Sequence, residues 1–311
     1  MAGFSQELPL DKWGAPIQRT NIVVRWKAPK PSWPKNLWTY RVVPTQFSPT
    51  VVSNMIALGN FINQDRSFFS TNGMYYSKEG RSLRISFIEG QIEYDGAYKS
   101  WQTNHVNLPE TNQLFQLTTN FLPTIGINLS EIAKNENGKF DIERVNDLGS
   151  MYMEGDVWTT NITGYEVWFR RALDGVRYRG DGGEGQITFG EHGQVEHIRL
   201  SWRSVEYDKL YPAATPRNII EWIHEGKAIF PHNYDAQGNL INIDWAGAKS
   251  ITIKKATAYY WSDLFFQREV DHQPILPCWV LPYVILSTTV DADHNNVDVE
   301  IDCPIIDETK Q

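Results

Sequence analysis

The chain has 311 residues, of which 41% are hydrophobic and 21% charged, a composition that excludes wholesale disorder. Its formal net charge is −8, and no run of Lys or Arg is longer than a pair such as Arg170–Arg171. A nucleic-acid partner requires a concentrated positive surface, so the sequence predicts none. The 12 Trp, 14 Tyr and 14 Phe favour strands and large buried areas.

No stretch approaches the roughly 18 uninterrupted apolar residues of a membrane-spanning helix. The N-terminal sequence MAGFSQELPLDKWGAPIQ lacks the basic start and apolar centre of a signal peptide. We therefore expect a cytoplasmic protein, or an extracytoplasmic one if an N-terminal signal or anchor has been removed.

The first third of the chain carries clear local signals. Five prolines in residues 1–36 predict an extended N-terminal arm, followed by a strand over 37–44. Ser48 as N-cap and Pro49 at the first helical position predict a helix. Three strand candidates follow, the last two of them joined through a turn at Glu89–Gly90.

The next third has the same sequence of elements. A second helix is predicted at about 109–122, and strand material follows at 156–172. Residues 183–207 then predict a β-hairpin, with Ile198, Leu200 and Trp202 on its buried face and His197, Arg199 and Arg203 facing solvent. A further helix is predicted from Thr215, as N-cap, to Gly226.

This order of helix, strands and helix occurs twice, which predicts an internal duplication. The tail from 250 onward alternates as strands, with a turn at 291–296. We expect an α+β fold of two tandem helix–antiparallel sheet–helix units, with a C-terminal β-hairpin completing the sheet. The predicted divisions are the arm at 1–36, a first unit at 37–135 and a second unit at 136–311.

Metal and catalytic motifs are weak. His192 and His197 stand five residues apart and do not converge on one ion, so no metal site or cofactor is predicted. Residues 291–302 resemble a calcium loop but lack its glycine and its final glutamate, which favours an acidic turn. Cys278 and Cys303 are either bridged or a pair of buried thiols. Without nucleophile or phosphate-loop motifs, the sequence leans away from an enzyme.

Tryptophans beside polar or proline-rich neighbours are the candidate ligand-binding residues, because displayed rings stack on sugars or grip peptides. They are Trp38, Trp101, Trp168 and Trp245.

The segments LWTYRVVPTQFSPTVVSNMIALGNF, RSLRISFIEGQIEY, GEGQITFGEHGQVEHIRLSWRSVEY and ATPRNIIEWIHEG, with the closing strands, resemble the PepSY-like superfamily. The similarity in layout is to tandem extracytoplasmic regulatory proteins of the YycI type. The resemblance implies an exported or membrane-anchored protein that acts by binding other proteins, and it supplies no active-site residue.

The leading hypothesis is a non-enzymatic binding or regulatory protein that recognises a protein or peptide partner. One alternative is an enzyme with an acid/base site in the cleft between two units, where His105, His224 or His272 bonded to a carboxylate would be its mark. The other is a carbohydrate-binding protein that uses its exposed tryptophans. The sequence leaves the oligomeric state open.

Overall fold

The fold was described from a computed structural model of the chain. The described residues are 15–16, 22–96, 107–154, 157–180, 182–230, 233–243, 245, 247–262, 279–292 and 295–306. Of these, 55% lie in strands and 17% in helical turns. The predicted α+β fold of two tandem helix–sheet–helix units is therefore wrong: the described part of the chain is mainly β, with three α-helices.

The chain divides into two compact units, neither of which is continuous in sequence. Unit 1 comprises residues 1–39, 207–260 and 281–311, and unit 2 comprises 40–206 and 261–280. The ranges predicted from the sequence, in contrast, are contiguous. The boundaries fall within β3 (Asn36–Val43), β14 (Ser204–Pro212), β18 (Ser250–Ser262) and β19 (Trp279–Ala292).

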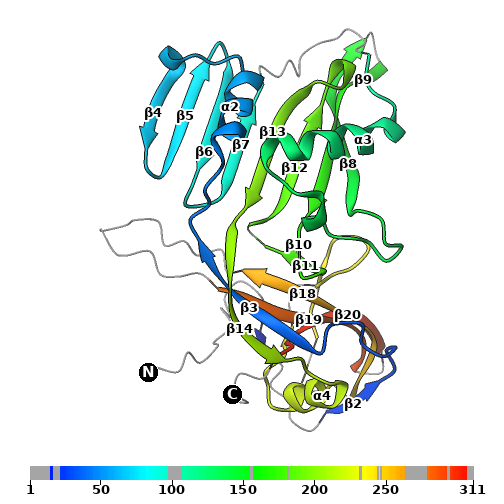
Figure 1. The fold of residues 1–311 in the computed structure, drawn as a ribbon. Helices are drawn as coiled ribbons and strands as arrows, with labels where there is room; N and C mark the ends of the chain where they lie inside the picture. Colours follow the sequence, from blue (N-terminus) through cyan, green and yellow to red (C-terminus); the bar gives the residue numbers. More distant parts are fainter. Residues whose placement is uncertain are drawn as a thin grey trace. The chain divides into compact units, whose positions relative to one another are not determined.

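Unit 2 is built on an eight-stranded sheet, in which all neighbouring strands are antiparallel (Figure 1). Its spatial order is β4-β5-β6-β7-β13-β12-β9-β8. The bounds are β4 Arg66–Ser70, β5 Gly73–Lys78, β6 Arg81–Ser86, β7 Gln91–Asp95, β8 Ile142–Glu154, β9 Val157–Arg170, β12 Gly183–Phe189 and β13 Val195–Trp202. A short hairpin of β10 (Ala172–Leu173) and β11 (Val176–Arg179) follows β9.

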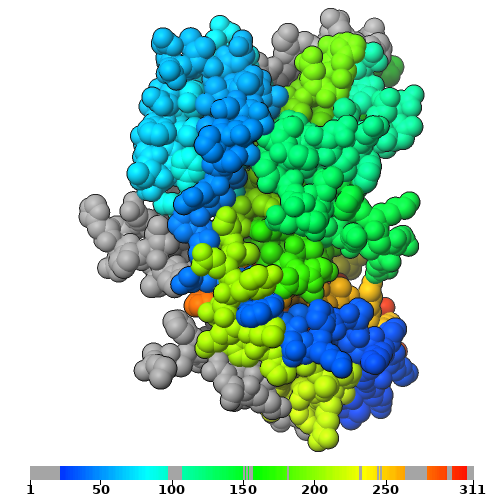
Figure 2. Space-filling view, in the orientation of Figure 1, coloured from blue at the N-terminus to red at the C-terminus, as the bar shows by residue number. Residues whose placement is uncertain are grey.

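One face of this sheet carries the core of unit 2. Period-two alternation places the apolar residues of each strand on this face, where α2 (Pro49–Leu58) and α3 (Thr111–Phe121) cover them. Met55 and Leu114 bring the two helices into the same buried cluster as Ile85, Ile187 and Phe169. Figure 2, in the orientation of Figure 1, shows the side of unit 2 on which the helices lie.

The predicted helix starts are confirmed with small shifts. The Ser48 hydroxyl accepts a hydrogen bond from the Val51 amide, as an N-cap does, and Pro49 is the first helical residue. The second helix begins at Thr111, two residues later than Pro109, and the Gln113 side chain accepts a hydrogen bond from the Glu110 amide at 3.0 Å, one half of a capping box.

Unit 1 contains the order β1-β15-β20-β19-β18, with β2 parallel to β18. The bounds are β1 Ala15–Pro16, β2 Val23–Trp26, β15 Ile229–Phe230 and β20 Asn295–Pro304. Helix α4 (Pro216–His224) begins at the predicted Thr215 cap and contacts β2 and β20. The predicted C-terminal hairpin is present as β19–β20, and a two-stranded sheet joins β16 (Asn233–Tyr234) to β17 (Leu240–Ile241).

Two observations contradict the predicted tandem units. The hairpins β6–β7 and β12–β13 pair directly, through β7 and β13, and form one sheet with a single core. Helix α4, expected to cover the second hairpin, belongs to unit 1. Similar local patterns are therefore used in different surroundings. Among the described residues, no helix is both long and apolar enough to cross a bilayer.

Candidate functional site

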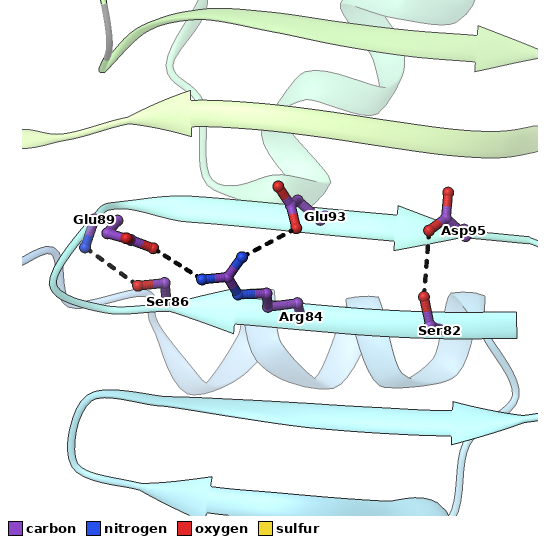
Figure 3. Close-up of polar contacts among 6 residues, drawn as sticks. All are labelled: Ser82, Arg84, Ser86, Glu89, Glu93 and Asp95. Carbon is purple, nitrogen blue, oxygen red and sulfur yellow. Dashed lines mark hydrogen bonds and ion pairs between the residues drawn. The ribbon is translucent and has the colours of Figure 1, made fainter. Parts of the chain in front are cut away.

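The eight-stranded sheet of unit 2 has a second, largely polar face, which we call the open face. Strand alternation requires it, because residues between the core positions point the other way. Figure 3 shows Ser82, Arg84, Glu93 and Asp95 on β6 and β7 on this face, with α2 behind the strands.

The register aligns one residue from every strand into a single row across the open face. We call these eight positions the cross-strand row. From β4 to β8 they are Phe68, Tyr75, Arg84, Glu93, Arg199, Gln186, Trp168 and Glu143. Aromatic residues lie toward both ends of the row and charged residues lie at its centre.

The aromatic end at β4 and β5 is open to solvent. The exposed fraction is 55% for Phe68 and 37% for Tyr75. Because β4 is an outer strand in the sheet order, these rings are displayed beside a sheet edge. Phe68 and Tyr75 are register partners, so their rings form a small exposed aromatic patch that is a candidate contact site.

The centre of the row is held by ion pairs (Figure 3). The Arg84 guanidinium lies 3.2 Å from Glu89 and 3.5 Å from Glu93, while Ser82 donates to Asp95 at 3.3 Å. About half of the Arg84 side chain remains exposed. These are solvent-screened pairs, which add little stability but fix the direction of the charged groups.

The other end of the row rests on a buried carboxylate. Glu166 is 7% exposed and accepts hydrogen bonds from Asn146 at 2.8 Å, from the Trp168 indole at 2.6 Å and from Gln186. Three donors compensate the burial of one carboxylate. The network orients Trp168, whose ring lies 6.0 Å from the Arg170 guanidinium carbon.

The hairpin at 183–207 is confirmed as β12–β13, but one of its residues lies elsewhere than predicted. Ile198, Leu200 and Trp202 are buried, and Arg199 is exposed on the open face. Arg203, predicted to face solvent, is only 1% exposed. The strand ends at Trp202, so the alternation that placed Arg203 outside no longer applies.

His197 and Glu196 lie at an irregular point of β13. His197 Nε2 is 3.3 Å from Asp95 Oδ1 on the open face, whereas His192 lies in the turn at positive φ. Glu196 is the extra residue of a bulge opposite Thr188 and Phe189. Burial raises the pKa of the Glu196 carboxyl, and the nearby Glu191 charge raises it further.

A second apolar surface lies at the end of the β8–β9 hairpin, where Met153 pairs with Trp158. We call it the hairpin tip. The exposed fractions are 67% for Met151, 56% for Met153, 66% for Val157 and 62% for Trp158. By register Met151, Met153 and Trp158 share one face of the hairpin, and Val157 lies on the other; such a cluster of three exposed side chains is typical of a contact surface.

The four candidate tryptophans lie in different settings. Trp168 belongs to the open face of unit 2. In unit 1, Trp38 packs against Tyr207 at a ring distance of 5.0 Å, and Trp245 meets Phe230 edge-on at 5.1 Å. Trp101 lies outside the described residues. All four remain predictions as ligand-binding residues.

The histidine–carboxylate contact expected of an enzyme can be checked only at His224 among the three candidate histidines. His224 bonds to the Ile22 carbonyl oxygen at 2.9 Å, and that partner is not a carboxylate. His105 and His272 lie outside the described residues, as does Cys278. Cys303 is a free, fully buried thiol, and burial raises its pKa. Over the described ranges, no three His, Cys, Asp or Glu side chains gather as a metal site.

No protein-family model matches the sequence, and no curated protein matches it significantly. The resemblance to the PepSY-like superfamily therefore remains a prediction.

Proposed function

We propose that this chain is a non-enzymatic binding protein that recognises a protein or peptide partner through the open face of unit 2. The cross-strand row carries the proposal, because Tyr, Trp, Phe and Arg, which supply five of its eight positions, are the residues enriched in protein interfaces. The exposed hairpin tip supports the same reading.

The aromatic residues and the charged residues of the row make different contributions to binding. Phe68, Tyr75 and Trp168 offer large rings, which bury apolar area with few rotors to immobilise. Arg84 and Arg199 flank Glu93 and offer charge of both signs, which favours a partner with a complementary charge pattern. β4 ends the sheet order among the described strands, so its outer edge would add backbone hydrogen bonds to an extended peptide.

The first test compares two substitutions of one kind, using immobilised full-length protein and extract from the native host. Tyr75→Ala removes a ring from the row, and Tyr234→Ala removes an exposed ring from β16 in unit 1. We expect Tyr75→Ala to reduce recovery of the partner by about 30-fold, as loss of an interface anchor does. Tyr234→Ala should leave recovery unchanged.

The second test uses charge. Arg84→Glu reverses the centre of the row, and Arg217→Glu reverses an exposed residue of α4. We expect Arg84→Glu to weaken recovery by about tenfold or more, with the loss growing at low salt. Equal recovery with both variants, or no partner recovered by the unaltered protein, would overturn the proposal.

Glycans provide the counter-test. If a glycan panel quenches tryptophan fluorescence and Trp168→Phe abolishes the quenching, the open face is a carbohydrate site and the protein-partner reading is wrong.

A further inference from the structure

A cavity of about 260 Å³ lies in unit 2 on the helix-covered side of the sheet, away from the open face. Its described walls come from the segment that leads into α2, from η2 (Leu122–Ile125) and η3 (Leu129–Glu131), and from the end of β13. At roughly 30 Å³ per water molecule, the volume admits only a small ligand of about ten non-hydrogen atoms.

Two buried arginines line this cavity. Arg171 is 8% exposed and Arg203 is 1% exposed, and Glu131 is the only carboxylate among the described lining residues. Burying a guanidinium is costly unless other groups compensate it. Arg171, which is paired with Glu131, is the arginine on which the inference rests.

The contacts of Arg171 show which of its N–H groups have partners. Its Nη2 lies 3.0 Å from Glu131 Oε2, and its Nη1 donates to the Arg203 carbonyl oxygen. Its Nε has no hydrogen-bond partner among the described residues. The guanidinium carbon lies 5.3 Å from the Trp202 ring, and the Trp202 indole donates to the same Glu131 oxygen at 3.1 Å. Arg171 is thus held in place by an ion pair and a backbone hydrogen bond, while its Nε–H has no acceptor among the described residues.

The N-terminus of α2 adds to the positive potential. Ser48 and Val51 line the cavity, the helix has ten residues, and no acidic residue lies in its first turn. The unpaired amides at a helix start favour a nearby negative charge. This is a second source of attraction, independent of the arginines.

We propose that this cavity binds a small molecule through an oxyanion group, either a carboxylate or a phosphate, held by Arg171 and the start of α2. The inference does not depend on the proposed partner binding, because the cavity lies on the other side of the sheet from the cross-strand row. The oxyanion shares Arg171 with Glu131, which makes that carboxylate its internal competitor.

The first test places a charge without disturbing the fold. Ser48→Asp keeps an N-cap of equal quality but adds a carboxylate beside the cavity. Thr215→Asp makes the matched change at the N-cap of α4 in unit 1. In calorimetric titrations with inorganic phosphate and, separately, acetate, we expect Ser48→Asp to weaken binding about tenfold. Thr215→Asp should bind as the unaltered protein does.

The second test predicts a gain. Glu131→Gln removes the competing charge, while its amide oxygen still accepts the Trp202 indole hydrogen bond. We expect about tenfold tighter oxyanion binding and a larger rise in Tm on adding the probe. Glu225→Gln, an exposed glutamate paired with Lys227, is the control and should change neither.

Binding of phosphate alone or of acetate alone identifies the class of oxyanion. If neither probe binds the unaltered protein or Glu131→Gln, or if Ser48→Asp binds as tightly as Thr215→Asp, the inference is overturned. Should Glu131→Gln not fold, the Ser48→Asp comparison decides. Recovery of a protein partner should be the same with Ser48→Asp, so failure here is distinguishable from failure of the proposed function.

Discussion

The two faces of the eight-stranded sheet are made by the same strands, yet they follow different rules. On the core face, Ile85, Ile187 and Phe169 are at most 1% exposed and pack beneath two helices. On the open face, Arg84 and Glu143 are half exposed and form ion pairs. The stability of unit 2 therefore depends mainly on the core face, and the open face is available for contacts.

The largest contrast is expected between neighbours on β9. Phe169→Ala removes a fully buried ring that packs on Trp202 and should cost about 3–5 kcal/mol of unfolding free energy. Trp168→Ala, on the open face, should cost less than half as much. Urea denaturation followed by circular dichroism measures both. Equal losses would mean that the open face is a second core.

Glu166 tests a place where the open face is buried. Glu166→Gln puts an amide donor among three donors and should cost about 1–3 kcal/mol. Glu93→Gln, an exposed glutamate of the cross-strand row, is the matched control and should cost less than about 1 kcal/mol. The same denaturation measurement applies, and a neutral Glu166→Gln would show that the network does not constrain the row.

The contribution of Glu196 to the stability of unit 2 should depend on pH. Because burial raises its pKa in the folded state, the folded protein holds this proton more tightly than the unfolded chain does. Its contribution to stability is present below the ordinary glutamate pKa of the unfolded chain and is lost as the pH rises through the higher pKa of the folded state.

Glu196→Gln should therefore be more stable than the unaltered protein at neutral pH, and the difference should vanish at acid pH. Thermal melting at a series of pH values measures it, with Glu143→Gln as an exposed control on β8. A difference in Tm that does not change with pH would contradict the expectation.

The smallest effect belongs to the centre of the cross-strand row. Arg84→Gln removes two exposed ion pairs and should change the unfolding free energy by less than about 1 kcal/mol. The same variant should weaken partner recovery, which separates a residue that binds from one that stabilises. A loss of several kcal/mol would place Arg84 in the structural core of the unit.

Local signals in the sequence were accurate where neighbours along the chain decide the structure. Ser48 with Pro49 and Thr215 with Pro216 located two helix starts, because capping satisfies amides within the same turn. Alternation identified the buried side of β13 as far as Trp202. It also placed Arg203 in solvent, because nothing local announces that the strand ends one residue earlier.

The cross-strand row was only partly accessible to sequence reasoning. Trp168 was a candidate, but its alignment with Tyr75 and Arg84 depends on pairing between β7 and β13, about 100 residues apart. A pattern of alternation says which side of a strand is polar and does not say which strands are neighbours. The same limit turned two similar hairpins into two predicted units, when they share one sheet.

The sequence by itself determined the helix caps, the hairpins and the strand-rich composition, since these depend on backbone bonds and side-chain spacing within a few residues. Tertiary structure alone decided that the hairpins merge into one sheet, that α4 joins the other unit, and that Arg171 and Arg203 line a cavity with Glu131. The physical reason is that burial and charge pairing arise between segments distant in the chain. Their energies depend on the folded environment and not on any one stretch of residues.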